Sequence, residues 1–191
     1  MTTMLKILIA GGFGVGKTTM VGAVSDIEPL STEEVMTAAG QATDDLDGIK
    51  SKTTTTVALD FGRLTLPGDV PLELYLFGMP GQDRFTDYWH DLAYGAAGAV
   101  VLADTRRLTV SYPAIDFFEQ MRLPFVIALN EFDGAHRYHP EQVRTAMDLH
   151  PGIPVVTCDA RSQAAAVGTL VTLIEHALDA VPADSLLLDA P

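Results

Sequence analysis

The sequence has little positive charge. It carries 12 Lys and Arg residues against 25 Asp and Glu residues, which gives a formal net charge of −13. A strongly acidic protein repels polyanions. The composition therefore argues against a nucleic-acid-binding surface, and we expect no nucleic acid among the partners.

Cysteine is nearly absent, because Cys158 is the one cysteine among 191 residues. One cysteine permits neither an internal disulfide nor a cysteine-rich metal cluster, and it suits a reducing compartment. We expect Cys158 to be a small buried residue. The five histidines show no metal-ligand spacing either.

Long apolar runs are also missing, since no stretch approaches the roughly 18 apolar residues that a membrane span needs. The N-terminal MTTMLKILIAGG has the length of a strand rather than of a signal peptide. The C-terminal PADSLLLDAP carries no cysteine for a lipid and no basic cluster. These features predict a cytoplasmic protein with no direct membrane anchor, so that any association with a membrane would depend on a partner.

Short apolar segments and helix-like segments alternate along the chain. The apolar segments are residues 4–10, 72–77, 98–103, 124–129 and 153–157, and the helix-like ones are 17–26, 84–95, 111–121, 139–149 and 162–180. This alternation is typical of an α/β fold with a mostly parallel sheet and helices on both faces. Residues 54–66 would add one antiparallel edge strand, which gives six strands in all. We expect one domain over residues 1–182, followed by a short tail, residues 183–191.

Residues 27–53 are polar and acidic and interrupt this alternation. Ser31 and Glu34 have the spacing of a helix capping box. We therefore expect this segment to be long, mobile and partly helical.

The strand-like LKILIA leads into GGFGVGKT, residues 11–18, which matches GxxxxGKT and opens a predicted helix. In this setting backbone N–H groups and the helix dipole point at a phosphate chain. Lys17 would reach the β- and γ-phosphates, and the Thr18 hydroxyl would bind Mg²⁺. The predicted nucleotide contacts here are Gly12, Phe13, Gly14, Val15, Gly16, Lys17, Thr18 and Thr19.

Two later strands end in polar motifs, NEFD at residues 130–133 and CDAR at 158–161. Open α/β sheets bind ligands at such strand ends. Here the chain resembles the Ras-like small GTPases, whose NKxD motif reads guanine and whose SAK motif follows one strand later. A carboxylate at Asp133 can accept hydrogen bonds from guanine N1–H and its 2-amino group, whereas adenine offers no such pair. The resemblance therefore implies GTP and GDP as ligands, bound by Asn130, Glu131, Asp133, Asp159, Ala160 and Arg161.

The two motifs depart from the family pattern, because Glu131 replaces the NKxD lysine and Asp159-Ala160-Arg161 replaces SAK. One hypothesis is that Arg161 pairs with Glu131 over the base and restores the stacking surface that the lysine would provide.

The segment LFGMPGQDRF, residues 76–85, breaks an apolar strand with glycines and proline. It resembles the family's DxxGQ switch motif, which implies that Gly81 senses the γ-phosphate and that Gln82 is the catalytic residue orienting water. Gly78 stands where the motif has its magnesium-binding aspartate. Magnesium would then depend on Thr18 and on Thr56, chosen by its TxxxDF spacing, with Asp60 either a substitute ligand or merely the end of a strand.

Together these motifs resemble the bacterial Ras-like small GTPases of actinobacterial conservons, distant relatives of the gliding-motility and polarity GTPases. The resemblance implies a P-loop NTPase fold and a signalling switch that slowly hydrolyses GTP. It also implies two partners, a roadblock-fold regulator and a sensor-kinase-like protein. Residues 82–89 would form the contact surface, unless their aromatic side chains instead pack a helix on the sheet.

Two other functions remain open at this point. Because the switch aspartate is missing, the chain could be a nucleotide-holding interaction module with negligible hydrolysis. The same phosphate-binding loop would also serve an ATP-dependent phosphotransferase.

Overall fold

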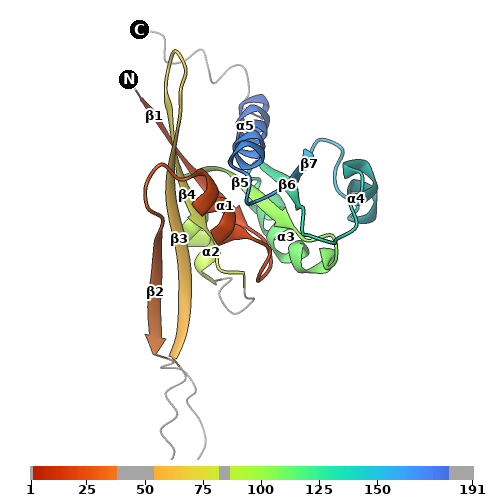
Figure 1. The fold of residues 1–191 in the computed structure, drawn as a ribbon, viewed down its shortest axis with the longest axis horizontal. Helices are drawn as coiled ribbons and strands as arrows, with labels where there is room; N and C mark the ends of the chain where they lie inside the picture. The colour runs from red at the N-terminus through yellow and green to blue at the C-terminus, as the bar shows by residue number, and fades with distance from the viewer. Residues whose placement is uncertain (1, 38–53, 82–86, 181–191) are drawn as a thin grey trace, which may run out of the picture.

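The computed structural model describes residues 2–37, 54–81 and 87–180, and these contain a seven-stranded sheet in the order β2-β3-β4-β1-β5-β6-β7 (Figure 1). The strands are β1 (Thr3–Ala10), β2 (Leu30–Thr37), β3 (Thr54–Leu66), β4 (Leu72–Gly78), β5 (Ala96–Ala103), β6 (Phe125–Asn130) and β7 (Val155–Cys158). The helices are α1 (Lys17–Val24), α2 (Asp87–Ala93), the 3₁₀ helix η2 (Leu108–Ser111), α3 (Tyr112–Met121), α4 (Pro140–Ala146) and α5 (Gln163–Asp179).

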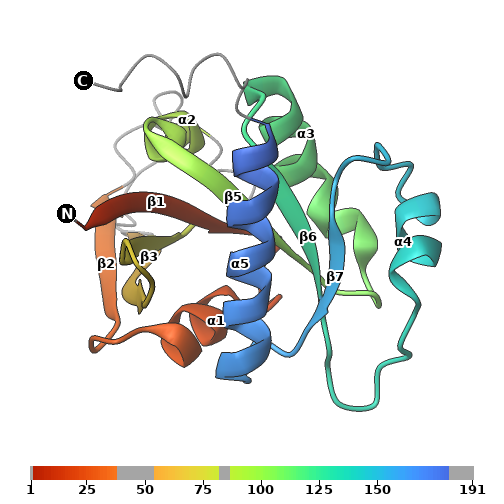
Figure 2. The same ribbon diagram turned by 90° about the horizontal axis from the view of Figure 1, so that it is seen from above.

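Five strands, β4, β1, β5, β6 and β7, are parallel, which confirms the predicted α/β architecture. Helices cover both faces, as expected (Figure 2). Side chains of α1 and α5 fill one apolar core, and side chains of α2, α3 and α4 fill the other. The strands between them are apolar on both sides, and the residues of β6 are all buried.

The sheet has one strand more than predicted. The prediction of partial helix over 27–53 was wrong for residues 30–37, which form β2. All of β2 pairs with residues 54–61 of β3. Ser31 lies opposite Asp60 and Glu34 opposite Val57, so the two residues do not form a capping box. The reason is tertiary: β3 pairs with β4 from Asp60 onward, and β2 supplies hydrogen-bond partners along the other edge of β3. The outer edge is therefore β2 and not residues 54–66.

The aromatic residues of α2 pack against the sheet. Trp89 is 5% exposed, and its indole N–H donates to the Pro80 carbonyl over 3.2 Å. Its ring meets Phe117 of α3 edge-on, with centroids 5.4 Å apart. Trp89 is thus a core residue rather than part of a contact surface, while Tyr88 is exposed. The remainder of that predicted surface, residues 82–86, lies outside the described residues.

Cys158 is buried at the end of β7, as predicted, and burial raises the pKa of its thiol. In the part of the chain that the structure describes, no helix is both long and apolar enough to cross a bilayer. The carboxyl ends of the parallel strands β1, β5, β6 and β7 lie at the same end of the sheet (Figure 1). The predicted site residues follow these strand ends.

Candidate functional site

The phosphate loop, residues 11–18, joins β1 to α1 in the predicted strand-loop-helix arrangement. Gly16 caps α1 in a left-handed conformation with φ 105°. A Cβ there would lie 2.6 Å from the Asn130 side-chain nitrogen, so the position requires glycine for both its backbone angle and its space. The first N–H groups of α1 consequently face the loop, where they suit an anion.

Lys17 is partly buried at the centre of this loop. Its ammonium donates to the carbonyls of Gly11 and Gly12 over 3.0 and 2.8 Å. Burial lowers the pKa of Lys17 to about 8, and the nearby Asp60 carboxylate partly opposes that shift. A largely buried ammonium that donates to two backbone carbonyls is a natural binding partner for phosphate oxygens.

Gly81 lies against the same loop, beyond the end of β4. A Cβ at Gly81 would lie 2.6 Å from Lys17 Nζ and 2.7 Å from the Gly12 carbonyl carbon. The segment after β4 therefore passes directly over the phosphate loop. Gln82, the predicted catalytic residue, follows it and lies outside the described residues.

Asp60 supplies a carboxylate beside the phosphate loop. It is 7% exposed and accepts a hydrogen bond from the Thr18 hydroxyl over 2.5 Å. Asp60 pairs with Gly78 across β3 and β4, and a Cβ at Gly78 would lie 3.1 Å from the Asp60 carboxylate. The Asp60 side chain thus borders the position where the predicted motif lacks its aspartate.

Thr56 is not brought to Thr18 in this structure. It pairs with Val35 in the two-stranded part of β2 and β3, which extends away from the helices (Figure 1). Thr56 lies four positions before Asp60 in β3, which is about 13 Å along the strand at the usual rise. Across residues 2–37, 54–81 and 87–180, no group of three or more His, Cys, Asp or Glu side chains is arranged to hold a metal.

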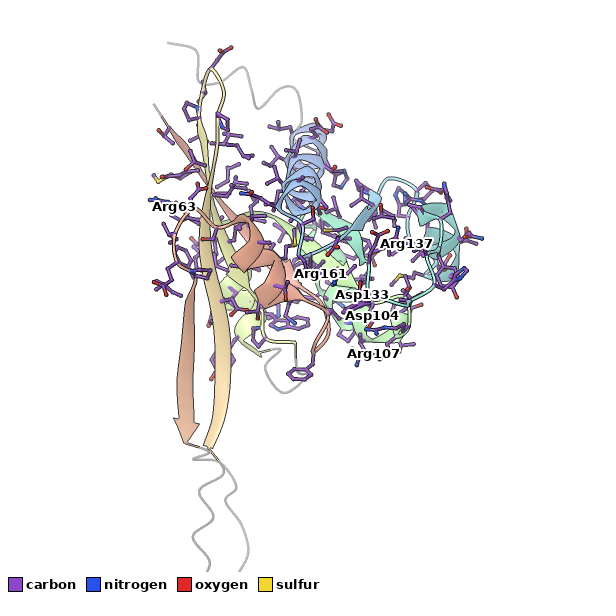
Figure 3. All side chains as sticks on the ribbon, viewed as in Figure 1. Arg63, Asp104, Arg107, Asp133, Arg137 and Arg161 are labelled. Atoms are coloured by element: carbon purple, nitrogen blue, oxygen red, sulfur yellow. The ribbon has the colours of Figure 1, made fainter. Side chains whose placement is uncertain are left out.

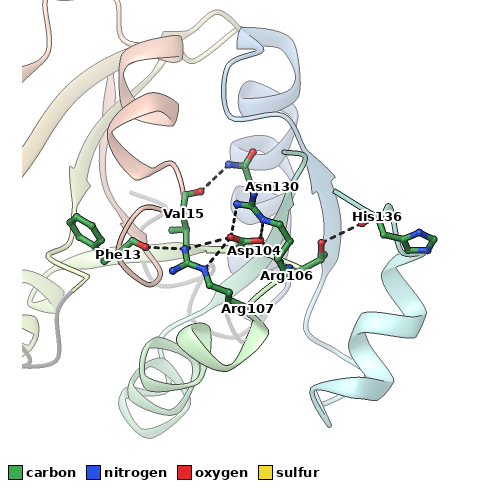
Figure 4. Close-up of polar contacts among 8 residues, drawn as sticks. Phe13, Val15, Asp104, Arg106, Arg107, Asn130 and His136 are labelled. Carbon is green, nitrogen blue, oxygen red and sulfur yellow. Dashed lines mark hydrogen bonds and ion pairs between the residues drawn. The ribbon is translucent and has the colours of Figure 1, made fainter. Parts of the chain in front are cut away.

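Asn130, at the end of β6, ties the phosphate loop to the loop after β7. Its side-chain amide donates to the Val15 carbonyl over 2.9 Å and accepts from the Ala160 N–H over 3.0 Å. Figure 4 shows the first of these contacts. Asn130 is buried, so its direct role is to hold three loops in register.

Asp133 and Arg161 form an exposed ion pair from the two predicted base-binding motifs. Two Arg161 nitrogens donate to the Asp133 carboxylate over 2.8 and 3.1 Å. Arg161 also binds Asp159, and its guanidinium lowers the pKa of both carboxyl groups. Glu131 instead lies 3.5 Å from Arg137, so the hypothesis of an Arg161–Glu131 pair is wrong for this structure.

A further cluster, which the sequence reasoning missed, follows β5. Asp104 is fully buried, and its carboxylate accepts hydrogen bonds from Arg106 and Arg107 (Figure 4). Arg106 lies over the Phe132 ring at 4.0 Å, and Arg107 reaches the Phe13 carbonyl of the phosphate loop. A charged run at the carboxyl end of a parallel strand is the signal that could have found this cluster.

These elements border an open cavity of about 360 Å³. Its lining residues come from the phosphate loop, α1 and the loops after β5, β6 and β7. They are Gly14, Gly16, Thr19, Arg106, Asn130, Glu131, Phe132, Asp133, Ala160 and Arg161. The volume lies within the range of small-molecule sites. Figure 3 shows Arg161, Asp133, Asp104 and Arg107 gathered at this end of the sheet, away from Arg63. Chemically, the region combines an anion-binding loop with a polar cavity beside it.

Comparison with known proteins agrees with this arrangement. A family model described as "conserved hypothetical ATP binding protein" matches residues 9–180. The human Ras-related protein Rab-7b is 24% identical over 184 residues, which cover 91% of this chain and 82% of Rab-7b. The G domain of the T. maritima FeoB iron transporter matches with a TM-score of 0.58 at 18% identity, over 92% of this chain and 98% of that one. The fold is thus that of a P-loop G domain, and the matches support homology to Ras-like P-loop proteins.

Proposed function

The chain belongs to the family described as conserved hypothetical ATP-binding proteins, and we propose that it is a guanine-nucleotide-binding switch that slowly hydrolyses GTP to GDP. The observation that carries the proposal is the position of Asp133. Asp133 lines a cavity that adjoins the phosphate loop. A carboxylate there can accept two hydrogen bonds from guanine and none of that kind from adenine.

The phosphate loop would bind the phosphates of the nucleotide. Lys17 and the N–H groups that open α1 supply the positive charge and the donors. The family resemblance assigns the same role to the backbone of residues 12–16. Gly81, whose backbone lies against Lys17, would respond to a γ-phosphate.

Magnesium fits the donor set of this site. Thr18 and Asp60 provide a hydroxyl and a buried carboxylate joined by a hydrogen bond, and Mg²⁺ prefers oxygen ligands of this kind. Thr18 would bind the ion, and Asp60 would hold it directly or through water together with phosphate oxygens. When bound, the ion neutralises developing phosphate charge. Thr56 joins this set only if β3 moves.

Hydrolysis and signalling follow from the resemblance to the conservon GTPases. We assign Gln82 to the orientation of water, and we expect slow turnover without a partner. The expected partners are a roadblock-fold regulator and a sensor-kinase-like protein in the cytoplasm. If hydrolysis is negligible, the chain instead holds a nucleotide as an interaction module.

The description of the family favours a second candidate, an ATP-binding protein. Competition decides between the two: a fluorescent GDP is displaced by GDP, GTP or ATP from the wild type and from Asp133→Asn. We expect GDP and GTP, but not ATP, to displace the fluorescent GDP from the wild type. Asp133→Asn should bind fluorescent GDP at least about ten-fold more weakly, because it loses charged hydrogen bonds to the base. Asp148→Asn makes the same change at an exposed aspartate of another loop. Equal displacement by ATP would overturn the guanine assignment.

A further inference from the structure

We propose that Arg106 is a fixed positively charged side chain lining the polar cavity beside the phosphate loop, and that it stacks on the purine ring of the bound nucleotide. This inference rests on the proposed function. It concerns a residue outside the phosphate loop and outside the two motifs that the sequence assigns to the base.

The position of Arg106 is the first support. It lines the same cavity as Asp133, from the proposed base-reading motif, and Gly14, from the phosphate loop. The guanidinium carbon lies 4.0 Å from the centroid of the Phe132 ring. Phe132 thus contacts the guanidinium, and a planar cation of this kind stacks well on an aromatic base.

The anchoring of Arg106 is the second support. Its Nε and Nη2 atoms each donate to the Asp104 carboxylate over 2.8 Å, and its backbone N–H donates to the same carboxylate over 2.9 Å. Asp104 is fully buried. A bidentate bond to a buried carboxylate fixes the plane of the guanidinium before any ligand arrives. Binding then costs little side-chain entropy.

The charge of the cavity is the third support. Position 131, which carries lysine in the resembling motif, is Glu131 here, and it lies beside Arg137. Arg161 is engaged with Asp133 and Asp159. Among the described residues that line the cavity, Arg106 is therefore the cation whose partner, Asp104, lies outside the base-binding motifs.

Arg107 extends the same unit to the phosphate loop. It shares the Asp104 carboxylate and donates to the Phe13 carbonyl over 3.3 Å (Figure 4). Asp104 thus fixes both Arg106, which lines the cavity, and Arg107, which contacts the phosphate loop.

The test compares the wild type with Arg106→Ala, Arg106→Lys and the control Arg122→Asn. Arg122 is an exposed arginine with φ 53° at the end of α3, and asparagine tolerates that backbone angle. The affinities for fluorescent GDP and for inorganic pyrophosphate are measured, with thermal unfolding to verify the fold. Arg106→Lys keeps a positive charge beside Asp104, so it serves if Arg106→Ala does not fold.

We expect GDP to bind about ten-fold more weakly to Arg106→Ala, as for the loss of one stacking partner of a base. Arg106→Lys should lose several-fold because it keeps the charge but not the planar group. Pyrophosphate affinity and Arg122→Asn should match the wild type. Unchanged GDP affinity in both Arg106 variants would overturn the inference, and so would an equal loss for pyrophosphate, which would make Arg106 a phosphate contact. A wild type that binds no guanine nucleotide would instead overturn the proposed function itself.

Discussion

Two nitrogens of Arg161 donate to the Asp133 carboxylate, over 2.8 and 3.1 Å. The same guanidinium binds Asp159 through Nε and Nη2, over 2.9 and 3.0 Å. The carboxylate proposed to read guanine is therefore already engaged by an arginine of the neighbouring motif. A guanine base would therefore compete with Arg161 for the Asp133 carboxylate, unless Arg161 turns fully toward Asp159.

Arg161→Ala should tighten guanine nucleotide binding. The change frees the Asp133 carboxylate, and exposed ion pairs are weak, so we expect a gain of at most a few-fold. Displacement of fluorescent GDP measures it, with Arg122→Asn as a control for the lost positive charge. Weaker binding in Arg161→Ala would mean that Arg161 contacts the nucleotide instead of competing with it.

Nucleotide binding should depend on pH through Lys17. Burial lowers the pKa of Lys17 to about 8 in the free protein. The bound phosphates keep the ammonium protonated, so affinity is full below pH 8 and falls as the pH rises above it, by up to about ten-fold per unit. Binding of fluorescent GDP at pH 7, 8 and 9 measures this slope.

The variant Lys17→Met separates this titration from that of the nucleotide. It should bind GDP more weakly at every pH and lose the part of the pH dependence that belongs to Lys17. If the wild type and Lys17→Met showed the same pH dependence of GDP affinity, the assignment of that pH dependence to Lys17 would be wrong.

The lowered pKa of Lys17 also makes the stability of the protein depend on pH. Between pH 8 and the ordinary lysine pKa of 10.5, the unfolded chain binds more protons, so the stability of the nucleotide-free protein should rise with pH.

Asp60→Asn should reduce the contribution of Mg²⁺ to nucleotide binding. The buried Asp60 carboxylate accepts from the Thr18 hydroxyl, and an amide is a much weaker magnesium ligand than a carboxylate. We expect the gain in GDP affinity on going from EDTA to Mg²⁺ to shrink about ten-fold. Asp116→Asn, at an exposed position of α3, is the matched control. If Asp60 serves only to orient Thr18, the magnesium titration of Asp60→Asn will follow that of the wild type.

Local sequence was enough to predict the strand-loop-helix of residues 4–18, because glycine spacing and the flanking apolar run specify it within a few residues. It was also enough to bring Asp133 and Arg161 to one edge of the sheet, since parallel strands place their carboxyl ends together. The α/β class followed from the same alternation.

The elements that were missed depend on pairing between distant segments. β2 forms because β3 offers it an edge, and this overrides the helical spacing of Ser31 and Glu34. The place of Asp60 beside Gly78 follows from the register of β3 on β4, which no local pattern specifies. Arg106 carried a local signal in its acidic-basic run, but its contact with Phe132 joins residues from two different strand ends.

Gly81→Ala should weaken the binding of GTP relative to that of GDP. A Cβ at Gly81 would lie 2.6 Å from Lys17 Nζ, 2.7 Å from the Gly12 carbonyl carbon and 2.8 Å from the Gly11 oxygen. Two of these neighbours are backbone atoms, so the segment after β4 must move away from the phosphate loop. We expect the ratio of GTP to GDP affinity to fall and the free energy of unfolding to drop by about 1–3 kcal/mol.

Gly22→Ala provides the control for this variant. Gly22 lies within α1, and a Cβ there would meet nothing within 4 Å. The substitution should raise the free energy of unfolding by about 0.5–1 kcal/mol through helix propensity and leave both affinities unchanged. Urea unfolding and nucleotide competition measure the two effects separately. A Gly81→Ala protein with the wild-type affinity ratio would show that a side chain at position 81 is tolerated beside the phosphates, and Gly81 would then lose its role as the γ-phosphate sensor.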